Sequence, residues 1–162
     1  MIQDVIAKSS TFAAAIKGKK KVVASTLLRF KEKDDKADSE FEFAEALHFD
    51  YDSGRTIRTL FNLTEGKAVK VEALEAYPTP LADEEFNQAI TLATEKDERV
   101  SALRKKHQEA DLEIQALAPV ISDKKNKRFG KRLAILTFMP KTKLEESVSV
   151  TVNLTDDVVL PE

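Results

Sequence analysis

RTLFNLT at residues 58–64 and VSVTVNLT at residues 148–155 are two copies of one pattern, and this repetition decides the fold of the chain. An apolar, strand-like segment precedes each copy, beginning at Phe49 in the first half and at Phe138 in the second. Each copy then leads into a turn. A pattern that recurs within one chain predicts that each copy is one supersecondary unit of the same kind. We therefore expect two tandem repeats.

The apolar pattern around each copy predicts a helix followed by antiparallel strands. In the first repeat we expect a helix within residues 2–16 and a polar turn at 31–39, with strands at 22–30, 41–51, 56–63 and 68–74. Alternation from Phe41 to Tyr51 is typical of a half-buried strand. In the second repeat a helix runs to about residue 103 with a break near Asp97, and strands follow at 112–121, 132–139, 147–154 and 158–160.

Pro78-Thr79-Pro80 separates the two repeats, because proline cannot continue a central strand but suits the first turn of a helix. The predicted domains are residues 1–77 and 78–162. The predicted fold class is α+β, a tandem duplication in which one helix packs on an antiparallel sheet of three to four strands in each repeat.

Composition excludes several classes of protein. Charged residues make up 33% of the chain but leave a formal net charge of only -2, which argues against a nucleic-acid binder. The chain has no cysteine, which excludes disulfides, thiol catalysis and zinc sites built on sulfur. No stretch approaches the ~20 apolar residues of a membrane span, and the N-terminus has no secretory signal. We expect a soluble, cytoplasmic protein; a secretion signal already removed from the sequence is the alternative.

The segment that opens the second repeat resembles a known family. Tyr77-Pro78-Thr79-Pro80-Leu81-Ala82-Asp83-Glu84-Glu85-Phe86, followed by Ala89 and a further apolar helix, resembles the opening of the small N-terminal domains of copper amine oxidases. The strand endings at residues 59–64 and 150–155 are similar to strand endings in those domains. The resemblance implies the cystatin-like α+β fold of these non-catalytic domains, in two copies.

The catalytic part of that family does not carry over to this chain. The family holds its copper with three histidines, whereas this chain has only His48 and His107. The family's cofactor arises from a tyrosine in an Asn-Tyr-acid motif, and Asp50-Tyr51-Asp52 has aspartate in place of the asparagine. We therefore expect no metal site and no cofactor.

Glu45, His48 and Tyr51 are the candidate polar lining of a pocket between helix and sheet. Strict alternation places Glu45 on the apolar face of its strand, where desolvation would raise its pKa and mark a site; the alternative is a β-bulge at residues 44–46 that returns it to solvent. His48 could act in acid–base or metal chemistry beside a carboxylate, or be an ordinary surface histidine. Tyr51 has the alternative interpretation of a strand-end residue before a turn.

The strongest charge run is KKNKRFGKR at residues 124–132. Lys124, Lys125, Lys127 and Arg128 around Phe129 could bind phosphates or an acidic protein. The alternative is a solvated hairpin loop. The corresponding connection of the first repeat, residues 32–38, is mixed in sign.

Three functional hypotheses follow. The leading hypothesis is a non-catalytic interaction or accessory module that binds an unknown protein partner, or a second copy, through edge strands. The alternative is a small-molecule-binding or enzymatic domain that uses Glu45, His48 and Tyr51. A third hypothesis assigns nucleic-acid binding to the basic run, although the overall charge of the chain argues against this class.

Overall fold

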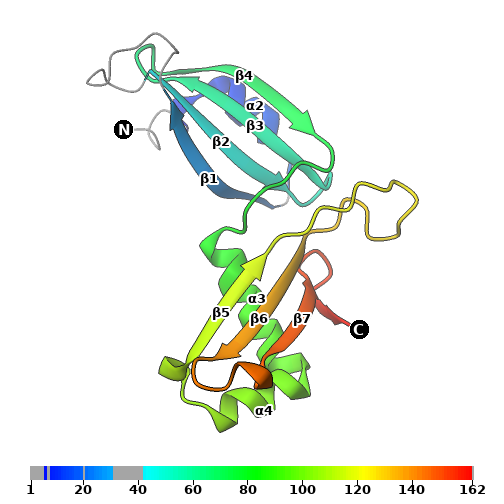
Figure 1. Ribbon diagram of the computed structural model, residues 1–162. Coiled ribbons are helices and arrows are strands. Elements are labelled where there is room, and N and C mark those ends of the chain that lie inside the picture. The colour runs from blue at the N-terminus through cyan, green and yellow to red at the C-terminus, as the bar shows by residue number, and fades with distance from the viewer. Residues whose placement is uncertain (1–5, 7, 20, 31–41, 162) are drawn as a thin grey trace. The chain divides into compact units, whose positions relative to one another are not determined.

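The computed structural model describes residues 6, 8–19, 21–30 and 42–161, and it divides the chain into two compact units, Met1–Thr79 and Pro80–Glu162. Each unit holds one four-stranded antiparallel sheet whose strands follow in sequence order, β1-β2-β3-β4 and β5-β6-β7-β8 (Figure 1). Helical residues precede the first strand of each sheet. The predicted α+β fold is therefore confirmed, and the common strand order is consistent with a duplicated unit.

The first unit contains helix α2 (Ser10–Ile16) and strands β1 (Val22–Phe30), β2 (Phe43–Asp50), β3 (Arg55–Asn62) and β4 (Lys67–Leu74). Ser9 caps α2 by accepting a hydrogen bond from the Phe12 backbone N–H at 3.1 Å. Gly18, with φ of 79°, follows the helix in a conformation that favours glycine. The predicted turn at residues 31–39 and the predicted strand residue Phe41 lie outside the described residues.

The central strand β2 differs from the predicted half-buried strand, because it is buried on both faces from Ala44 to Asp50. Ala44 and Ala46 lie on one face and form a core with Phe61 of β3, against which Ile6 packs. Phe12 of α2 lies against His48 on that same face. The small side chains of Ala44 and Ala46 allow a helix to approach this face of the sheet closely. The bulky residues Phe43, Leu47 and Phe49 alternate with them and lie on the opposite face.

The second unit contains two helices, α3 (Asp83–Lys96) and α4 (Glu98–Lys106), where one was expected per sheet. Asp97 lies at the predicted break, and its side chain caps α4 by accepting hydrogen bonds from the backbone N–H groups of Arg99 and Val100. Strands β5 (Leu112–Leu117), β6 (Leu133–Pro140), β7 (Val148–Asn153) and β8 (Val158–Leu160) follow, with two short 3₁₀ helices at Glu109–Asp111 and Leu144–Glu146. The core side chains of this unit are fully or almost fully buried: Ala89, Leu92, Ala93, Val100, Leu103, Leu136, Phe138, Val150 and Val152.

Strand β5 is shorter than predicted, because it ends at Leu117 and not at Ile121. Pro119 lies two residues further on and has no N–H to donate to a strand ladder. The connection from Ala118 to Arg132 is a long loop that joins the antiparallel strands β5 and β6.

An asparagine at the equivalent position of each repeat closes the turn after the third strand of each sheet. In the first unit the side-chain oxygen of Asn62 accepts the Glu65 backbone N–H at 2.9 Å. In the second, the side-chain oxygen of Asn153 accepts the Asp156 backbone N–H at 3.2 Å. Asparagine favours such turns because its side chain bonds the backbone ahead of it. This shared role accounts for the repeated Asn-Leu-Thr of the sequence.

None of the helices described here has both the length and the apolar character that a bilayer crossing requires.

Candidate functional site

The candidate residues Glu45 and His48 lie on opposite faces of the first sheet. Successive side chains of a strand alternate between faces. Glu45 is paired with Leu60 of β3 on one face, whereas His48 contacts Phe12 of α2 on the other. Tyr51 follows the end of β2 on the face of Glu45, six residues along. The strand therefore separates His48 from the other two, and the three do not line one pocket.

Glu45 forms an ion pair within the sheet. Its side-chain carboxylate accepts a hydrogen bond from Nε of Arg58 at 2.6 Å, and the residue is 8% exposed. This hydrogen bond raises the pKa of Arg58 above its usual value. The predicted bulge at residues 44–46 is wrong, because β2 pairs with β3 without interruption; the irregularity of this sheet edge lies in β1, between Ala24 and Thr26.

His48 belongs to the core of the first unit, so the surface interpretation is wrong. It is 5% exposed, and its ring centre lies 4.6 Å from that of Phe12. Burial lowers the pKa of His48 to about 4, so the imidazole is neutral at pH 7. Its Nδ1 has no hydrogen-bond partner among the residues that the structure describes. The side chain acts in packing here, with one polar atom left unsatisfied.

Tyr51 is half-buried at the start of the turn that follows β2. Its ring lies edge-on to Phe49, with 5.2 Å between centres, and the Lys21 ammonium is 4.3 Å from the ring centre. Both contacts are of kinds that stabilise a folded surface.

Asp50 organises this end of the first sheet, although sequence reasoning gave it no role. It is 1% exposed and accepts hydrogen bonds from the Asp52 backbone N–H at 3.1 Å, from the Ser53 hydroxyl and from Lys19, whose Nζ lies 2.7 Å away. Burial opposes ionisation of Asp50, but these hydrogen bonds outweigh it and hold the pKa of the carboxyl below its usual value. The turn signal Asp-x-Asp-Ser could have identified it.

A pocket of about 120 Å³ adjoins Asp50 and is also lined by Ala15, Lys19, Ser53 and Arg55. Ligand sites for small molecules commonly enclose ~300–1,000 Å³. The pocket is therefore too small for most metabolites.

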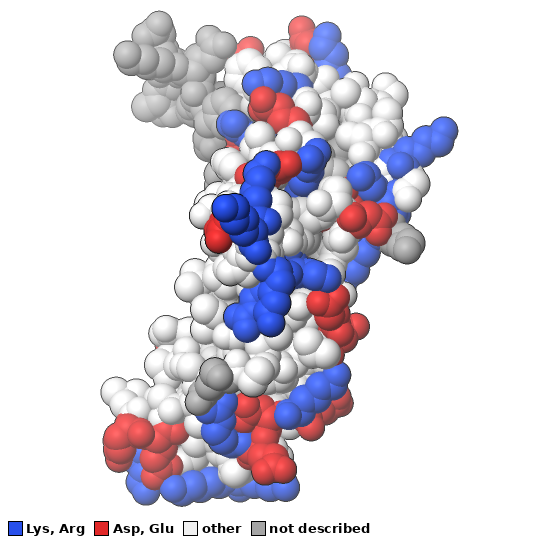
Figure 2. Space-filling view, turned by 90° about the vertical axis from the view of Figure 1, so that its right-hand side faces the viewer, with Lys and Arg blue, Asp and Glu red and all other residues white. Residues whose placement is uncertain are grey.

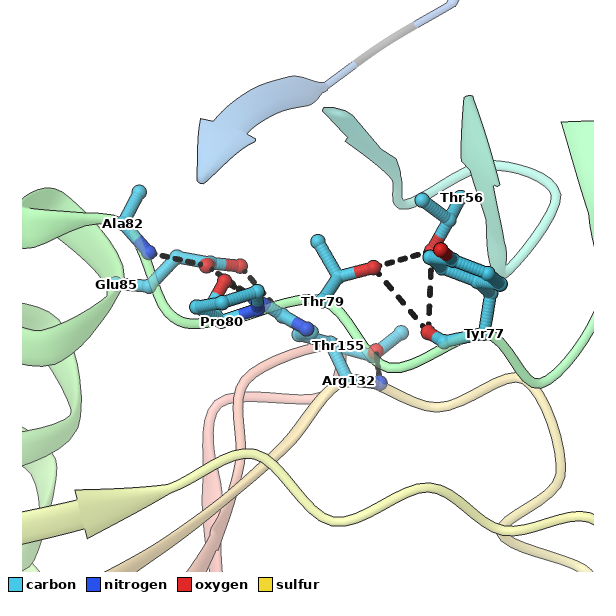
Figure 3. Close-up of polar contacts among 8 residues, drawn as sticks. All are labelled: Thr56, Tyr77, Thr79, Pro80, Ala82, Glu85, Arg132 and Thr155. Atoms are coloured by element: carbon cyan, nitrogen blue, oxygen red, sulfur yellow. Dashed lines mark hydrogen bonds and ion pairs between the residues drawn. The ribbon is translucent and has the colours of Figure 1, made fainter. Parts of the chain in front are cut away.

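The most deeply buried ion pair of the described residues joins Arg132 to Glu85 in the second unit (Figure 3). Arg132, just before β6, donates from Nε and Nη2 to the two Glu85 oxygens at 2.8 and 2.7 Å, and from Nη2 to the Pro80 carbonyl oxygen at 2.7 Å. The Glu85 carboxylate also accepts the Ala82 backbone N–H at 2.9 Å, which satisfies one donor at the start of α3. The Arg132 and Glu85 side chains are 5% and 1% exposed.

This cluster joins three segments of the second unit by hydrogen bonds within the fold. The Arg132 backbone N–H donates to the Thr155 hydroxyl at 2.8 Å, which adds the turn after β7. Sequence reasoning had placed Arg132 at the end of the basic run. The sequence signal that could have identified this cluster is Glu85, the third residue of a helix. Glutamate at that position commonly accepts a hydrogen bond from the N-cap backbone.

The remaining cations of the run lie in the loop between β5 and β6. Lys124, Lys125 and Lys127 are exposed, and Arg128 is partly exposed. Figure 2 views the molecule from the side to which this loop projects in Figure 1, and lysine and arginine side chains stand out on its surface. Phe129 is half-buried, and Nζ of Lys124 lies 5.9 Å from its ring centre.

The two histidines of the chain lie in different surroundings. His48 lies in the first unit and His107 in the second. Nε2 of His107 is 2.9 Å from a Glu146 oxygen, and hydrogen bonds from Lys106 and His107 lower the pKa of Glu146 to about 2. Within the described residues no three His, Cys, Asp or Glu side chains lie close enough to hold a metal ion. No step of a copper-dependent reaction can be assigned to these residues.

Comparison with known proteins gives a fold and no activity. No protein-family model matches the sequence, and a search of curated proteins finds no relative. Among solved structures, the chain is similar to the crystal structure of a copper-containing benzylamine oxidase from Hansenula polymorpha, with a TM-score of 0.54 and 12% sequence identity. The likeness covers 99% of this chain but only 28% of that one. The chain thus shares its fold with part of a copper amine oxidase.

Proposed function

We propose that the chain is a non-catalytic interaction module of two cystatin-like units, and that strand β5 of the second unit receives a strand from a partner protein. The observation that carries this proposal is the exposed edge of β5. Edge strands present unpaired backbone N–H and C=O groups, and an extended peptide can add to them by main-chain hydrogen bonds.

Strand β5 has few of the features by which natural proteins protect an edge. It pairs with β6 in an unbroken register, from Leu112 opposite Pro140 to Leu117 opposite Ile135. Its six residues include one charged side chain, Glu113, and no proline. Leu117 is 62% exposed. Bulges, charges and prolines are the usual protection of an edge strand, so β5 offers both backbone and apolar contacts.

The other edges are better protected or shorter. Strand β8 has three residues. Strand β4 carries Lys67, Lys70 and Glu72, which lie in exposed or partly exposed ion pairs. Strand β1 has a register irregularity after Ala24. Within the described residues, β5 is therefore the edge best suited to strand addition.

The polar clusters of the molecule support a non-catalytic role. The carboxylates of Glu45, Asp50 and Glu85 each bind a cation within the fold, at 2.6 to 2.7 Å. A general acid or base needs a free position from which to reach a substrate proton. Because Glu45 and His48 point to opposite faces and Phe12 covers His48, the pocket hypothesis lacks a convergent set of residues.

Two exposed leucines of the second unit provide a matched test. Leu117 on β5 is 62% exposed and Leu144, in the short helix before β7, is 65% exposed. Leu117→Lys places a charge on the proposed edge, whereas Leu144→Lys places the same charge elsewhere. We expect both variants to fold with stability within ~0.5 kcal/mol of wild type, since exposed substitutions change little.

Wild type, Leu117→Lys and Leu144→Lys are each used to capture proteins from a lysate of the source organism, and the captured proteins are quantified by mass spectrometry. Sedimentation velocity of each purified protein alone measures self-association. We expect a protein that wild type and Leu144→Lys capture and that Leu117→Lys loses. A self-associated species lost only in Leu117→Lys would identify a second copy as the occupant of the edge. Capture and association that are unchanged by Leu117→Lys would exclude β5 as the binding edge.

A further inference from the structure

We propose that residues 121–131 of the loop between β5 and β6 (the basic loop) bind an acidic protein segment rich in Asp and Glu. This surface is separate from the edge of β5 and rests on its own observations. The basic-loop proposal can therefore be tested independently of the strand-addition proposal.

The basic loop consists of successive hydrogen-bonded turns. The backbone carbonyl oxygens of Asp123, Asn126 and Arg128 each accept the backbone N–H three residues ahead, at 2.9 to 3.1 Å. The side-chain oxygens of Asp123 and Asn126 accept the N–H groups of Lys125 and Arg128, both at 2.9 Å. Gly130, with φ of 73°, continues the chain toward β6. Successive turns of this kind hold the cationic side chains on a fixed backbone, which lowers the entropy cost of binding.

At the base of the loop, two cations form ion pairs within the second unit, one partly exposed and one buried. Nζ of Lys131 lies 2.8 Å from an Asp156 oxygen, and Arg132 pairs with Glu85. Along the loop itself the situation is different. Lys125, Lys127 and Arg128 form no ion pair with any residue that the structure describes. The one acidic residue of the loop, Asp123, caps the backbone next to Lys125. The loop thus presents positive charge that its own unit leaves uncompensated.

The fold does not require this charge. The corresponding connection of the first repeat, at residues 32–38, contains four acidic and two basic residues. The basic character is therefore particular to the second repeat. A local cluster of one sign attracts a partner of the opposite sign and raises the rate of encounter.

The chemistry favours an acidic protein segment over a polynucleotide. The chain as a whole has a formal net charge of -2, and nucleic-acid-binding domains usually carry a basic excess that extends over a face. Phe129 is the loop's single aromatic side chain, and Lys124 lies against its ring. Single-strand binding relies on several aromatic platforms along a groove. Carboxylates flanking an apolar side chain would match this arrangement better.

The test uses the full chain and a fluorescein-labelled peptide of alternating Asp and Glu around a central Phe. The loop variant is Lys125→Ala, Lys127→Ala and Arg128→Ala together. The matched control is Lys67→Ala, Lys70→Ala and Lys105→Ala together, three exposed lysines on other elements. Both variants lower the net charge by three, so a non-specific effect of overall charge appears equally in both.

We expect fluorescence anisotropy to show peptide binding that weakens with salt and falls roughly tenfold in the loop variant, because each exposed charge pair contributes modestly. The control variant should bind within about twofold of wild type. Equal weakening in both variants would overturn the assignment to this loop, as would a wild-type protein that does not bind the peptide. Tighter binding of a single-stranded oligonucleotide of the same charge would overturn the choice of partner class.

Discussion

Replacing Arg132 with alanine is expected to lower the free energy of unfolding of the second unit by about 3–5 kcal/mol, because it leaves a buried carboxylate without its cation. Glu85, whose side chain is 1% exposed, would keep the Ala82 backbone N–H but lose both guanidinium hydrogen bonds. The Pro80 carbonyl oxygen would lose its donor as well. A loss of this size is a large part of the ~5–15 kcal/mol that stabilises a typical domain.

Spectroscopy can assign this loss to the second unit. Both tyrosines, Tyr51 and Tyr77, lie in the first unit, and the chain has no tryptophan. Tyrosine fluorescence therefore follows the first unit during urea unfolding, while far-UV circular dichroism follows both. We expect Arg132→Ala to move the circular dichroism transition to lower urea concentration and to leave the tyrosine transition unchanged.

The neighbouring Lys131 provides the control for this experiment. Its ion pair with Asp156 has a similar distance, 2.8 Å, but the two side chains are 34% and 46% exposed. Lys131→Ala should therefore change stability far less, since water compensates an exposed charge. A double-mutant cycle with Glu85→Ala measures the coupling directly. Equal stability of Arg132→Ala and Lys131→Ala would show that burial of the pair has no energetic consequence.

Acidification is expected to destabilise the first unit through His48. The pKa of His48 is about 4 in the folded protein and 6.5 in an unfolded chain, so the unfolded state binds more protons between these values. The contribution of neutral His48 to the free energy of unfolding is therefore fully present above pH 6.5. It declines as the pH falls and is lost near pH 4. The expected loss between pH 7 and pH 4 is about 3 kcal/mol. Urea unfolding followed by tyrosine fluorescence at a series of pH values measures it.

Substitution of the histidine separates this effect from other acid effects. His48→Leu removes the titrating group, so stability should stay nearly level between pH 6.5 and pH 4. Asp50 acts at lower pH than His48. Because the pKa of Asp50 is lowered in the folded protein, the stability that its ionised form provides is lost only as the pH falls below the ordinary value of 3.8. A His48→Leu protein that still loses the same stability above pH 4 would show that another group is responsible.

Strand positions were predictable because they depend on local pattern. The first and last strands, Val22–Phe30 and Val158–Leu160, have the predicted bounds. The error at β5 arose because apolar residues continue past Pro119, whose missing N–H stops the ladder. The error at β2 has another origin. Alternation identifies one buried face, but it cannot show that Ala44 and Ala46 are covered by a helix on the other.

The candidate site was harder to predict, because ion pairing depends on residues distant in sequence. Arg58 reaches Glu45 from 13 positions away, and Arg132 reaches Glu85 from 47 positions away. Before folding, Arg132 is indistinguishable from the lysines beside it. The roles of Glu45, His48 and Tyr51 in ligand binding stay predictions, although their geometry does not bring them together.

The sequence by itself determined the α+β class, the duplicated order of strands and the turn that follows each repeated motif. These features depend on side-chain period and on turn chemistry, which act between near neighbours. Only the tertiary structure decided that His48 is buried beneath Phe12, that Arg132 is a core residue and that β5 is an exposed edge. Burial depends on what packs against a residue, and the packing partners of these residues come from other elements of the fold.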